Sequence, residues 1–559
     1  MDTRNVLFAV ILSTIVLIFW ATFFEPPITE KNIQQKKSTQ NESVETPSVE
    51  ETENLQKISR NEAINSVDRI KLENNNIKGS ISLQGGIIDD VTFKNYNKKL
   101  NGNEKIVFLN PKNSDEGYYI ESGWASSGSE KTKLPVDNSK WIVKGNTLLA
   151  PNNPITLEWD NGEGLIFTKE IKLDNNFLFT VTQKIKNNSN KSFQFFPYVQ
   201  ITRNYKPEVT PIYILHEGFL GVFGDELREM DYEDVDEKKF IANSSKGWLG
   251  ITDKYWLTAI VPEKGKNFKS EFLNQNGKYK ANFIIKDPTI INPGSSSTSI
   301  SNIFVAAKEV STIDNYAEKL GIEKFDLTID WGWFYFFTKP LFFAIDYFFK
   351  LTGNFGWAIV IITALVRLIF FPLANYSFRS MAKMKVLQPE MLRLKEVHKD
   401  DKAKLQQEMM ALYKREKVNP VSGCLPVLIQ IPFFFAIYKM LYVTLEMRHQ
   451  PFFGWIKDLS ERDPTSIFNL FGIIPWDPPT FLMIGAWPIL MGISMFIQQK
   501  LNPTPPDPIQ AKIFMFFPIF LTIILAPFPS GLVVYWTINN ILTIAQQWVI
   551  MRSTKVKTI

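Results

Sequence analysis

Cysteine and histidine are scarce in this chain. Its 559 residues include one cysteine, Cys424, and three histidines, at positions 216, 398 and 449. A single cysteine excludes a disulfide framework and disfavours a cysteine-based metal site. The sequence also lacks the HExxH, GxSxG and Walker A motifs. We therefore expect a protein that is not an enzyme and that uses no cofactor, no metal and no nucleotide.

Strong charge of either sign is also missing. The formal net charge is +5, and the polar part of the chain shows no dense basic stripe, so direct DNA binding is not expected. The average composition hides two unlike regions. Residues from about 25 to about 325 are polar, with many Asn and Lys, whereas the chain from about 331 onward is rich in Phe, Ile, Leu, Trp and Pro. The second composition is typical of membrane segments.

The N-terminal region predicts a membrane anchor followed by a tether. An apolar run, Val6–Phe24, follows Arg4 and approaches the ~20 residues that cross a bilayer. It ends in bulky phenylalanines rather than at a small-residue cleavage site. We expect an uncleaved transmembrane anchor over 1–25. Residues 26–60 are rich in Glu, Lys, Gln, Ser and Thr, which predicts a flexible periplasmic tether.

Short alternating runs bounded by Gly, Asn and Asp occupy residues 61–325. In FLFTVTQKIKNNS, for example, Phe177, Phe179 and Val181 share one face of an extended segment. Many such runs predict an all-β sandwich of antiparallel strands. A short helix around 311–320 is expected to close this domain.

The rest of the chain predicts helices on and in a membrane. Residues 331–350 are rich in aromatics but contain Lys339, Pro340 and Asp346, which predicts an interfacial amphipathic helix. Five apolar segments follow, at 355–376, 423–443, 480–498, 511–528 and 530–550. Together with the anchor they predict six transmembrane helices.

Basic residues predict the orientation of these helices. The segment 379–418 is strongly basic, and the tail 552–559 carries Arg552, Lys555 and Lys557 without an acid. The positive-inside rule therefore places both termini and the 379–418 segment in the cytoplasm, and the β domain in a bacterial periplasm. A seam of Met and Leu predicts that 379–418 forms a helical hairpin. It could be self-contained, or it could also dock a ribosome, anionic lipid or a nascent segment.

One full charge, Arg367, lies inside the first apolar segment. It is far from both ends of the segment, and none of the five segments contains an Asp or Glu to neutralise it. Because an unpaired guanidinium needs water, we infer a hydrated cavity. Thr363 lies one turn earlier on the same side, and Pro372 predicts a bend near Leu368.

Other polar side chains are candidates to line this cavity. Gln430 lies in the second of the five segments. In the last segment Trp536, Asn540, Thr543 and Gln547 follow helical spacing, with Tyr535 and Asn539 beside them. Such residues more often hold helices together. A cavity with fixed positive charge and no acids suits a negatively charged guest that passes through or docks, and transport of an anion or lipid is one function that would use it.

Three stretches carry a family resemblance. SMAKMKVLQPEM, QQEMMALYKREKVNPVSGCLPVLIQIPFF and FPSGLVVYWTINNILTIAQQW resemble the YidC/Oxa1/Alb3 membrane protein insertases, in their Gram-negative bacterial form. The resemblance implies a periplasmic β-supersandwich and a five-helix insertase core, 355–551, with a hydrophilic groove. It implies that Arg367 and Thr363 lie in the groove. Tyr535-Trp536 stands where some members have a tyrosine pair.

The resemblance also implies a function and partners. We expect an inner-membrane insertase and chaperone that moves transmembrane segments of nascent proteins from the cytoplasm into the membrane, alone or with the Sec translocon. Further expected partners are membrane lipid, and a ribosome or targeting factors at the hairpin and tail. The expected substrate-groove residues are Arg367, Thr363, Gln430, Tyr535, Trp536 and Asn540.

Overall fold

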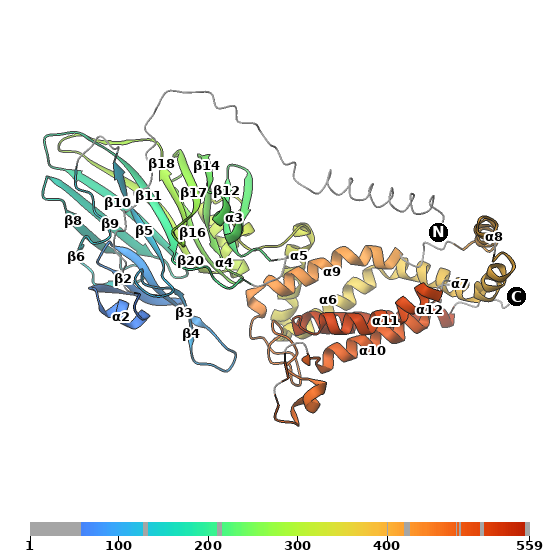
Figure 1. Cartoon of the computed structure of the whole chain (residues 1–559). Coiled ribbons are helices and arrows are strands. Elements are labelled where there is room, and N and C mark those ends of the chain that lie inside the picture. Colours follow the sequence, from blue (N-terminus) through green and yellow to red (C-terminus); the bar gives the residue numbers. More distant parts are fainter. Residues whose placement is uncertain are drawn as a thin grey trace. The chain divides into compact units, whose positions relative to one another are not determined.

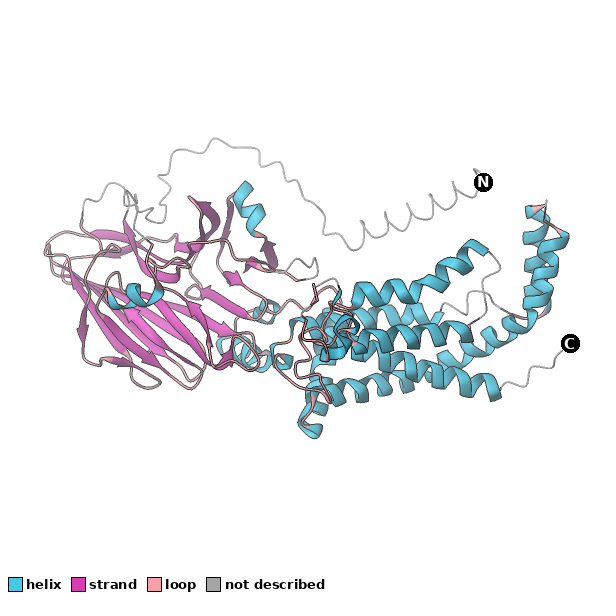
Figure 2. Cartoon of the chain, turned by 60° about the horizontal axis from the view of Figure 1, so that its bottom comes forward, coloured by secondary structure: helices cyan, strands magenta, loops and turns pink. Residues whose placement is uncertain are grey.

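The structure is a computed structural model (Figure 1). It describes residues 57–126, 132–209, 215–399, 401–418, 425–476, 478–479, 482–502 and 508–553. The predicted anchor, most of the tether and most of the C-terminal tail lie outside these residues. Within them, strands occupy the chain up to Ala307 and helices α5 to α12 occupy the chain from Tyr335 (Figure 2).

Two mostly antiparallel sheets build the β domain. The eleven-stranded sheet has the order β14-β17-β18-β11-β5-β3-β2-β1-β7, with β4 and β19 paired at its side. The nine-stranded sheet has the order β13-β12-β15-β16-β20-β10-β9-β8-β6. The strands of the first sheet are β1 (Arg69–Glu73), β2 (Ile77–Ser82), β3 (Ile87–Asn97), β4 (Lys105–Leu109), β5 (Tyr118–Ser126), β7 (Leu148–Leu149), β11 (Phe193–Arg203), β14 (Phe240–Ser244), β17 (Phe268–Gln275), β18 (Lys278–Ile285) and β19 (Thr289–Ile291). Those of the second are β6 (Ile142–Lys144), β8 (Ile155–Asp160), β9 (Leu165–Leu173), β10 (Leu178–Asn187), β12 (Gly218–Phe223), β13 (Glu226–Met230), β15 (Gly247–Thr252), β16 (Trp256–Val261) and β20 (Ser296–Ala307).

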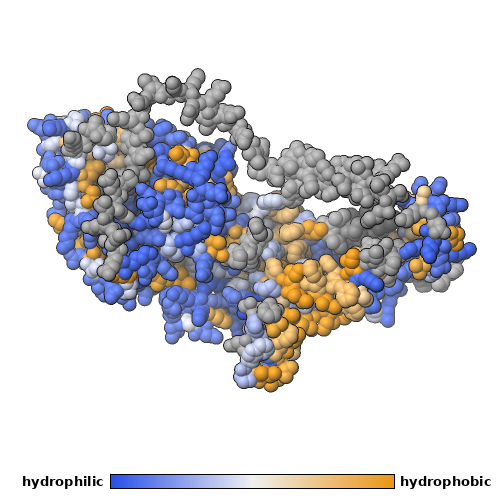
Figure 3. Space-filling view, viewed as in Figure 1, coloured by the Kyte–Doolittle hydropathy of each residue, from blue (hydrophilic) through white to orange (hydrophobic). Residues whose placement is uncertain are grey.

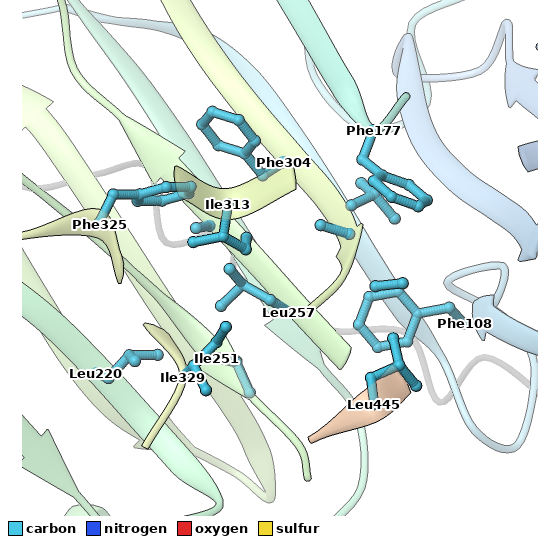
Figure 4. Close-up of a cluster of buried hydrophobic side chains, with 14 of the residues drawn as sticks. Phe108, Phe177, Leu220, Ile251, Leu257, Phe304, Ile313, Phe325, Ile329 and Leu445 are labelled. Carbon is cyan, nitrogen blue, oxygen red and sulfur yellow. The ribbon is translucent and has the colours of Figure 1, made fainter. Parts of the chain in front are cut away.

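Alternation along the strands creates the core of the domain. Phe177, Phe179 and Val181 are buried as their spacing predicts, because every second side chain of a strand points to the same face. Figure 4 shows part of this core, where the Phe304 and Phe325 rings lie 4.7 Å apart between centroids. The expected closing helix is confirmed as α4 (Val310–Leu320), which ends at Gly321 in the left-handed conformation.

Short helices occur in both parts of the chain. The β domain and its end contain α2 (Arg60–Asn65), α3 (Tyr232–Glu237) and the 3₁₀ turn η1 (Phe325–Thr328), whereas the 3₁₀ turns η3 (Leu445–Met447) and η4 (Ile467–Gly472) lie between α9 and α10.

Eight longer helices follow in the described residues, and all but α8 include part of an expected apolar or interfacial segment. They are α5 (Tyr335–Thr352), α6 (Phe355–Ile369), α7 (Phe371–Val397), α8 (Lys402–Arg415), α9 (Leu425–Val443), α10 (Ala486–Leu501), α11 (Pro508–Leu525) and α12 (Ser530–Ser553). Helix α12 packs against α6, α7, α9 and α10, and α10 also packs against α11. Judged by length and hydropathy, none of the described helices qualifies as a membrane span by itself, whereas the bent pair α6–α7 could form one. The six-helix count therefore stays a prediction.

The bend expected near Leu368 is confirmed at Phe370. Helix α6 ends at Ile369, α7 begins at Phe371, and the two are bent by 68°. Pro372 lies in the first turn of α7, where a missing backbone N–H costs nothing. Helix α7 continues from Phe371 to Val397 and so runs through position 379, where the predicted hairpin begins. The bounds of the hairpin as a domain stay a prediction.

The hairpin has its own small core. Leu387 and Met391 of α7 pack with Leu412 of α8 and with Val418, which agrees with the expected seam. The helix predicted over 331–350 appears as α5. Its Lys339 is not exposed to solvent as a free charge: its Nζ lies 2.9 Å from Asp314 and 2.8 Å from Asp326.

Candidate functional site

Arg367 lies in the last turn of α6, and two amide side chains hold its guanidinium. Nε donates to Oδ1 of Asn539 on α12 at 2.9 Å, and Nη2 donates to Oε1 of Gln430 on α9 at 3.0 Å. Three helices that are distant in sequence therefore meet at this one charge. Both partners are neutral, so they orient the guanidinium without cancelling its charge.

A cavity opens beside this guanidinium. It has room for water-sized molecules amounting to about 40 Å³, and since one water needs roughly 10–15 Å³ of such room, it can hold a few waters. Its walls come from α6, α7, α9 and α12: Thr363, Val366, Arg367, Phe370, Leu373, Ala374, Gln430, Phe433, Ile437, Tyr535 and Asn539. Arg367 is the one charged residue among these lining residues, so the cavity carries a net positive charge.

The structure brings four of the six expected groove residues together. Arg367, Thr363, Gln430 and Tyr535 all line the cavity. The Thr363 hydroxyl donates to the Ile359 carbonyl oxygen of its own helix at 2.6 Å. Its hydrogen is therefore used within α6, although the residue lines the cavity. Tyr535 is buried and lies beside Gln430. Their role toward a substrate remains a prediction.

The other two expected residues lie elsewhere. Trp536 packs on Phe434 of α9, with ring centroids 4.7 Å apart, and is not among the lining residues. Asn540 is buried against α10, where its Nδ2 donates to the Ser494 hydroxyl at 2.9 Å. Farther along, Gln547 donates to Asn502 at 3.1 Å. This row of α12 holds two helices together, as polar side chains in membrane bundles commonly do.

Asn539 is the cavity residue that the sequence-based list missed. The sequence shows two adjacent polar rows on the last helix, one through 536, 540, 543 and 547 and one through 535, 539 and 546. Their spacing cannot say which row faces Arg367. Packing on α10 settles the choice, since Ser494 occupies the side that receives Asn540. The sequence did show Asn539, but only as the neighbour of Asn540, which was the residue listed for the groove.

Exposed apolar side chains surround the helical part of the chain. On α10 and α11, Ile493 is 51% exposed, Ile513 62% and Phe516 59%, and such side chains gather in orange on the visible face (Figure 3). A soluble protein rarely exposes apolar patches of this extent. A β domain, a bundle with an apolar exterior and a charged inner cavity together define a class: an integral membrane protein with a large extramembrane domain.

Comparison with known proteins makes the class specific. Residues 69–344 match the family model "YidC periplasmic domain", and residues 347–557 match "60Kd inner membrane protein". The membrane protein insertase YidC of Pelagibacter ubique (strain HTCC1062) is 58% identical over 560 residues, covering 100% of both chains. That of Brucella suis biovar 1 (strain 1330) is 44% identical over 591 residues, covering 100% of this chain and 96% of the relative. The chain therefore belongs to the YidC family of membrane protein insertases, proteins of the bacterial inner membrane with a periplasmic domain.

Solved structures give weaker likenesses. A crystal structure of an active YidC insertase is matched with a TM-score of 0.34 and 18% identity, over 85% of this chain and 91% of that one. A galactose mutarotase related enzyme from Lactobacillus acidophilus is matched with a TM-score of 0.31 and 12% identity, over 43% of this chain and 98% of that one.

The family resemblance found in the sequence is confirmed by the relatives, whose names describe insertases and not enzymes. They give the transporter alternative no support.

Proposed function

We propose that the cavity around Arg367 is the groove in which this insertase accepts a polar segment of an incoming membrane protein. One observation carries the proposal. The guanidinium is oriented by two neutral amides in a cavity with room for water, and no carboxylate lines that cavity. The positive charge is thus positioned but remains available to a negatively charged guest.

The cavity lowers the main barrier to insertion. A nascent membrane protein must carry a short polar segment, often acidic, through a hydrocarbon layer about 30 Å thick. A hydrated cavity that reaches part of the way shortens the apolar path. Arg367 attracts the segment transiently, and the following apolar helix then partitions into lipid. Burial of its apolar surface, at about 25 cal/mol per Å², supplies the driving force without a nucleotide.

We also propose the topology that this mechanism needs. In this topology six helices span the membrane, both termini and the α7–α8 hairpin lie in the cytoplasm, and the cavity receives the nascent chain from that side. The basic residues of segment 379–418 and of the tail support this orientation.

The hairpin supplies a docking element in the same proposal. Its inner seam is filled by its own side chains, which leaves the basic outer face for a ribosome, a targeting factor or anionic lipid. Cooperation with the Sec translocon and assistance in folding the inserted client complete the proposed role.

Site-directed crosslinking tests the groove. A photoreactive amino acid is placed at Gln430 or Tyr535, which line the cavity, and at Asn540, which is the matched control on the α10 side of α12. With a stalled nascent membrane protein, we expect crosslinks to the client from the first two positions and none from the third. Client crosslinks from Asn540 without crosslinks from Gln430 would place the path on the wrong side of α12.

A further inference from the structure

The connection between α9 and α10 contains a segment whose polarity is inverted. We define the apolar loop as Ser466–Trp476, with the sequence SIFNLFGIIPW, which carries no charged residue. Ile473 is 81% exposed, more than any other large apolar side chain described. Six large apolar side chains are between 41% and 81% exposed: Phe468, Leu470, Phe471, Ile473, Ile474 and Trp476.

The polar groups of the apolar loop point inward instead. The Ser466 side chain is fully buried and Asn469 is 9% exposed. The backbone N–H of Phe471 donates to the Ser466 carbonyl at 2.7 Å, and that of Ile474 donates to the Asn469 carbonyl at 3.0 Å. The Phe468 N–H donates to the Ser466 hydroxyl at 3.2 Å. Pairing of these backbone N–H groups lowers the cost of contact with an apolar medium, where an unpaired backbone group is expensive.

The backbone of the apolar loop accepts strain to reach this arrangement. Leu470 (φ 49°) and Phe471 (φ 59°) are consecutive non-glycine residues in the left-handed region. Such conformations are costly and persist where the surroundings favour them. In this case they leave two large apolar side chains half exposed. Water would not favour that result, whereas hydrocarbon would.

The base of the apolar loop is fixed to the start of α10. The Ile467 N–H donates to the Ile484 carbonyl at 3.1 Å, and the Ser466 hydroxyl donates to the Leu482 carbonyl at 2.9 Å. One oxygen of Asp463 accepts the Trp487 N–H in the first turn of α10 at 2.9 Å. The loop is therefore held at the end of a helix whose exterior is itself apolar.

The surface of the apolar loop continues the apolar exterior of the bundle. On α10, Leu490, Ile493 and Phe496 are 44% to 51% exposed, in the same range as the loop side chains. In an inner-membrane protein this exterior of α10 faces lipid. A partner that covers both the apolar loop and the exterior of α10 must be apolar, uncharged and present along the whole helix. These properties fit a bilayer better than a protein.

We propose that the apolar loop inserts into the hydrocarbon edge of the membrane at the α10 end of the bundle, as an additional lipid anchor beside the groove. The occupant of this surface is the acyl-chain region of the lipids. The proposal rests on the membrane location of the bundle, and it adds a contact that the groove mechanism does not require.

Collision accessibility of a spin label tests the proposal in the full chain. With Cys424→Ser as background, a single cysteine replaces one of three exposed isoleucines: Ile473 in the apolar loop, Ile493 on α10, or Ile290 on β19 of the β domain. Each variant is labelled, reconstituted in vesicles of phosphatidylethanolamine and phosphatidylglycerol, and exposed to oxygen or to a water-soluble nickel chelate. The ratio of the two collision rates at Ile473 is expected to be several-fold above that at Ile290 and close to that at Ile493.

The outcomes separate this inference from the proposed function. A ratio at Ile473 equal to that at Ile290 overturns the inference, and so does a label shielded from both reagents, which would mean that protein covers the loop. If the ratio at Ile493 also equals that at Ile290, the bundle itself is not in the membrane, and this result contradicts the proposed function rather than the inference alone. As an independent measurement, Trp476→Phe should remove part of the fluorescence that brominated lipids quench, whereas Trp159→Phe in the β domain should remove none.

Discussion

Replacing Arg367 tests whether its charge or its hydrogen-bonding geometry matters for insertion. Lysine keeps the charge as a point but cannot reach Asn539 and Gln430 with one planar group. If the groove works by attraction, Arg367→Lys retains most activity, Arg367→Ala loses it for clients with acidic translocated segments, and Arg367→Glu is worse because attraction becomes repulsion. Clients with neutral or very short translocated segments should change little.

The loss of insertion rate in Arg367→Ala depends on how strongly the cavity is hydrated. Two unit charges 4 Å apart attract by about 4 kcal/mol at an effective dielectric near 20 and by about 1 kcal/mol in bulk water. With room for a few waters beside Arg367, the true value lies between these limits. Since each 1.36 kcal/mol is tenfold in rate, Arg367→Ala should slow an acidic client by roughly fivefold to a thousandfold.

The assay measures insertion of matched acidic and neutral clients into vesicles that contain equal amounts of each variant. Asn539→Leu and Gln430→Met serve as controls, because they remove the amides that orient the guanidinium and leave its charge. If Arg367 is instead a brace that ties α6 to α9 and α12, lysine should fail nearly as badly as alanine and every client should suffer alike. That outcome would refute the attraction mechanism.

Further outcomes are expected for the β domain, the hairpin, Gly356 and Glu121. The β domain, about 60–320, should melt cooperatively when expressed alone, and deleting most of it should leave insertion intact, since every cavity residue follows position 350; an aggregate, or loss of insertion with a folded core, would contradict this. Deleting Lys383–Lys417 should impair insertion, and normal insertion by a folded variant would reduce the hairpin to a connector. Gly356→Ala should lower the melting temperature of the chain, because the new Cβ would lie 1.9 Å from the Phe452 ring and such overpacking costs about 1–3 kcal/mol; adding Phe452→Leu should recover part of the loss. Burial, together with a nearby aspartate, raises the pKa of Glu121 from 4.5 to about 7. The folded domain then binds the proton more tightly than the unfolded chain, so the stability of the domain should fall as the pH rises from about 4.5 to 7. Urea titrations at several pH values should show that the stability of Glu121→Gln depends less on pH.

The sequence was sufficient for features that depend on local pattern. Alternation placed Phe177, Phe179 and Val181 in the β core, because the two-residue period of a strand fixes which side chains share a face. Pro372 predicted the bend between α6 and α7, because a proline ring cannot continue a regular helical turn. The charge of Arg367 within an apolar segment predicted a cavity, because an isolated charge needs water or a partner.

Tertiary structure decided which side chains meet that charge. Gln430 and Asn539 come from helices that are far apart in sequence, and only their packing brings both amides to one guanidinium. Between adjacent polar rows of α12, the sequence offered no preference, because residues 539 and 540 differ by only 100° around a helix. The hydroxyl of Ser494 on α10 receives Asn540, and this contact turns Asn539 toward the cavity.

The apolar loop shows the same division. Its composition was visible as SIFNLFGIIPW, but hydrophobic residues in a sequence normally predict burial. Hydrogen bonds to Ser466 and Asn469 turned its polar groups inward and left Ile473 on the surface. A local pattern fixes which residues share a face of one element, because the period of that element is set by its backbone. Which medium or neighbour each face meets depends on contacts between distant elements, and these exist only once the chain has folded.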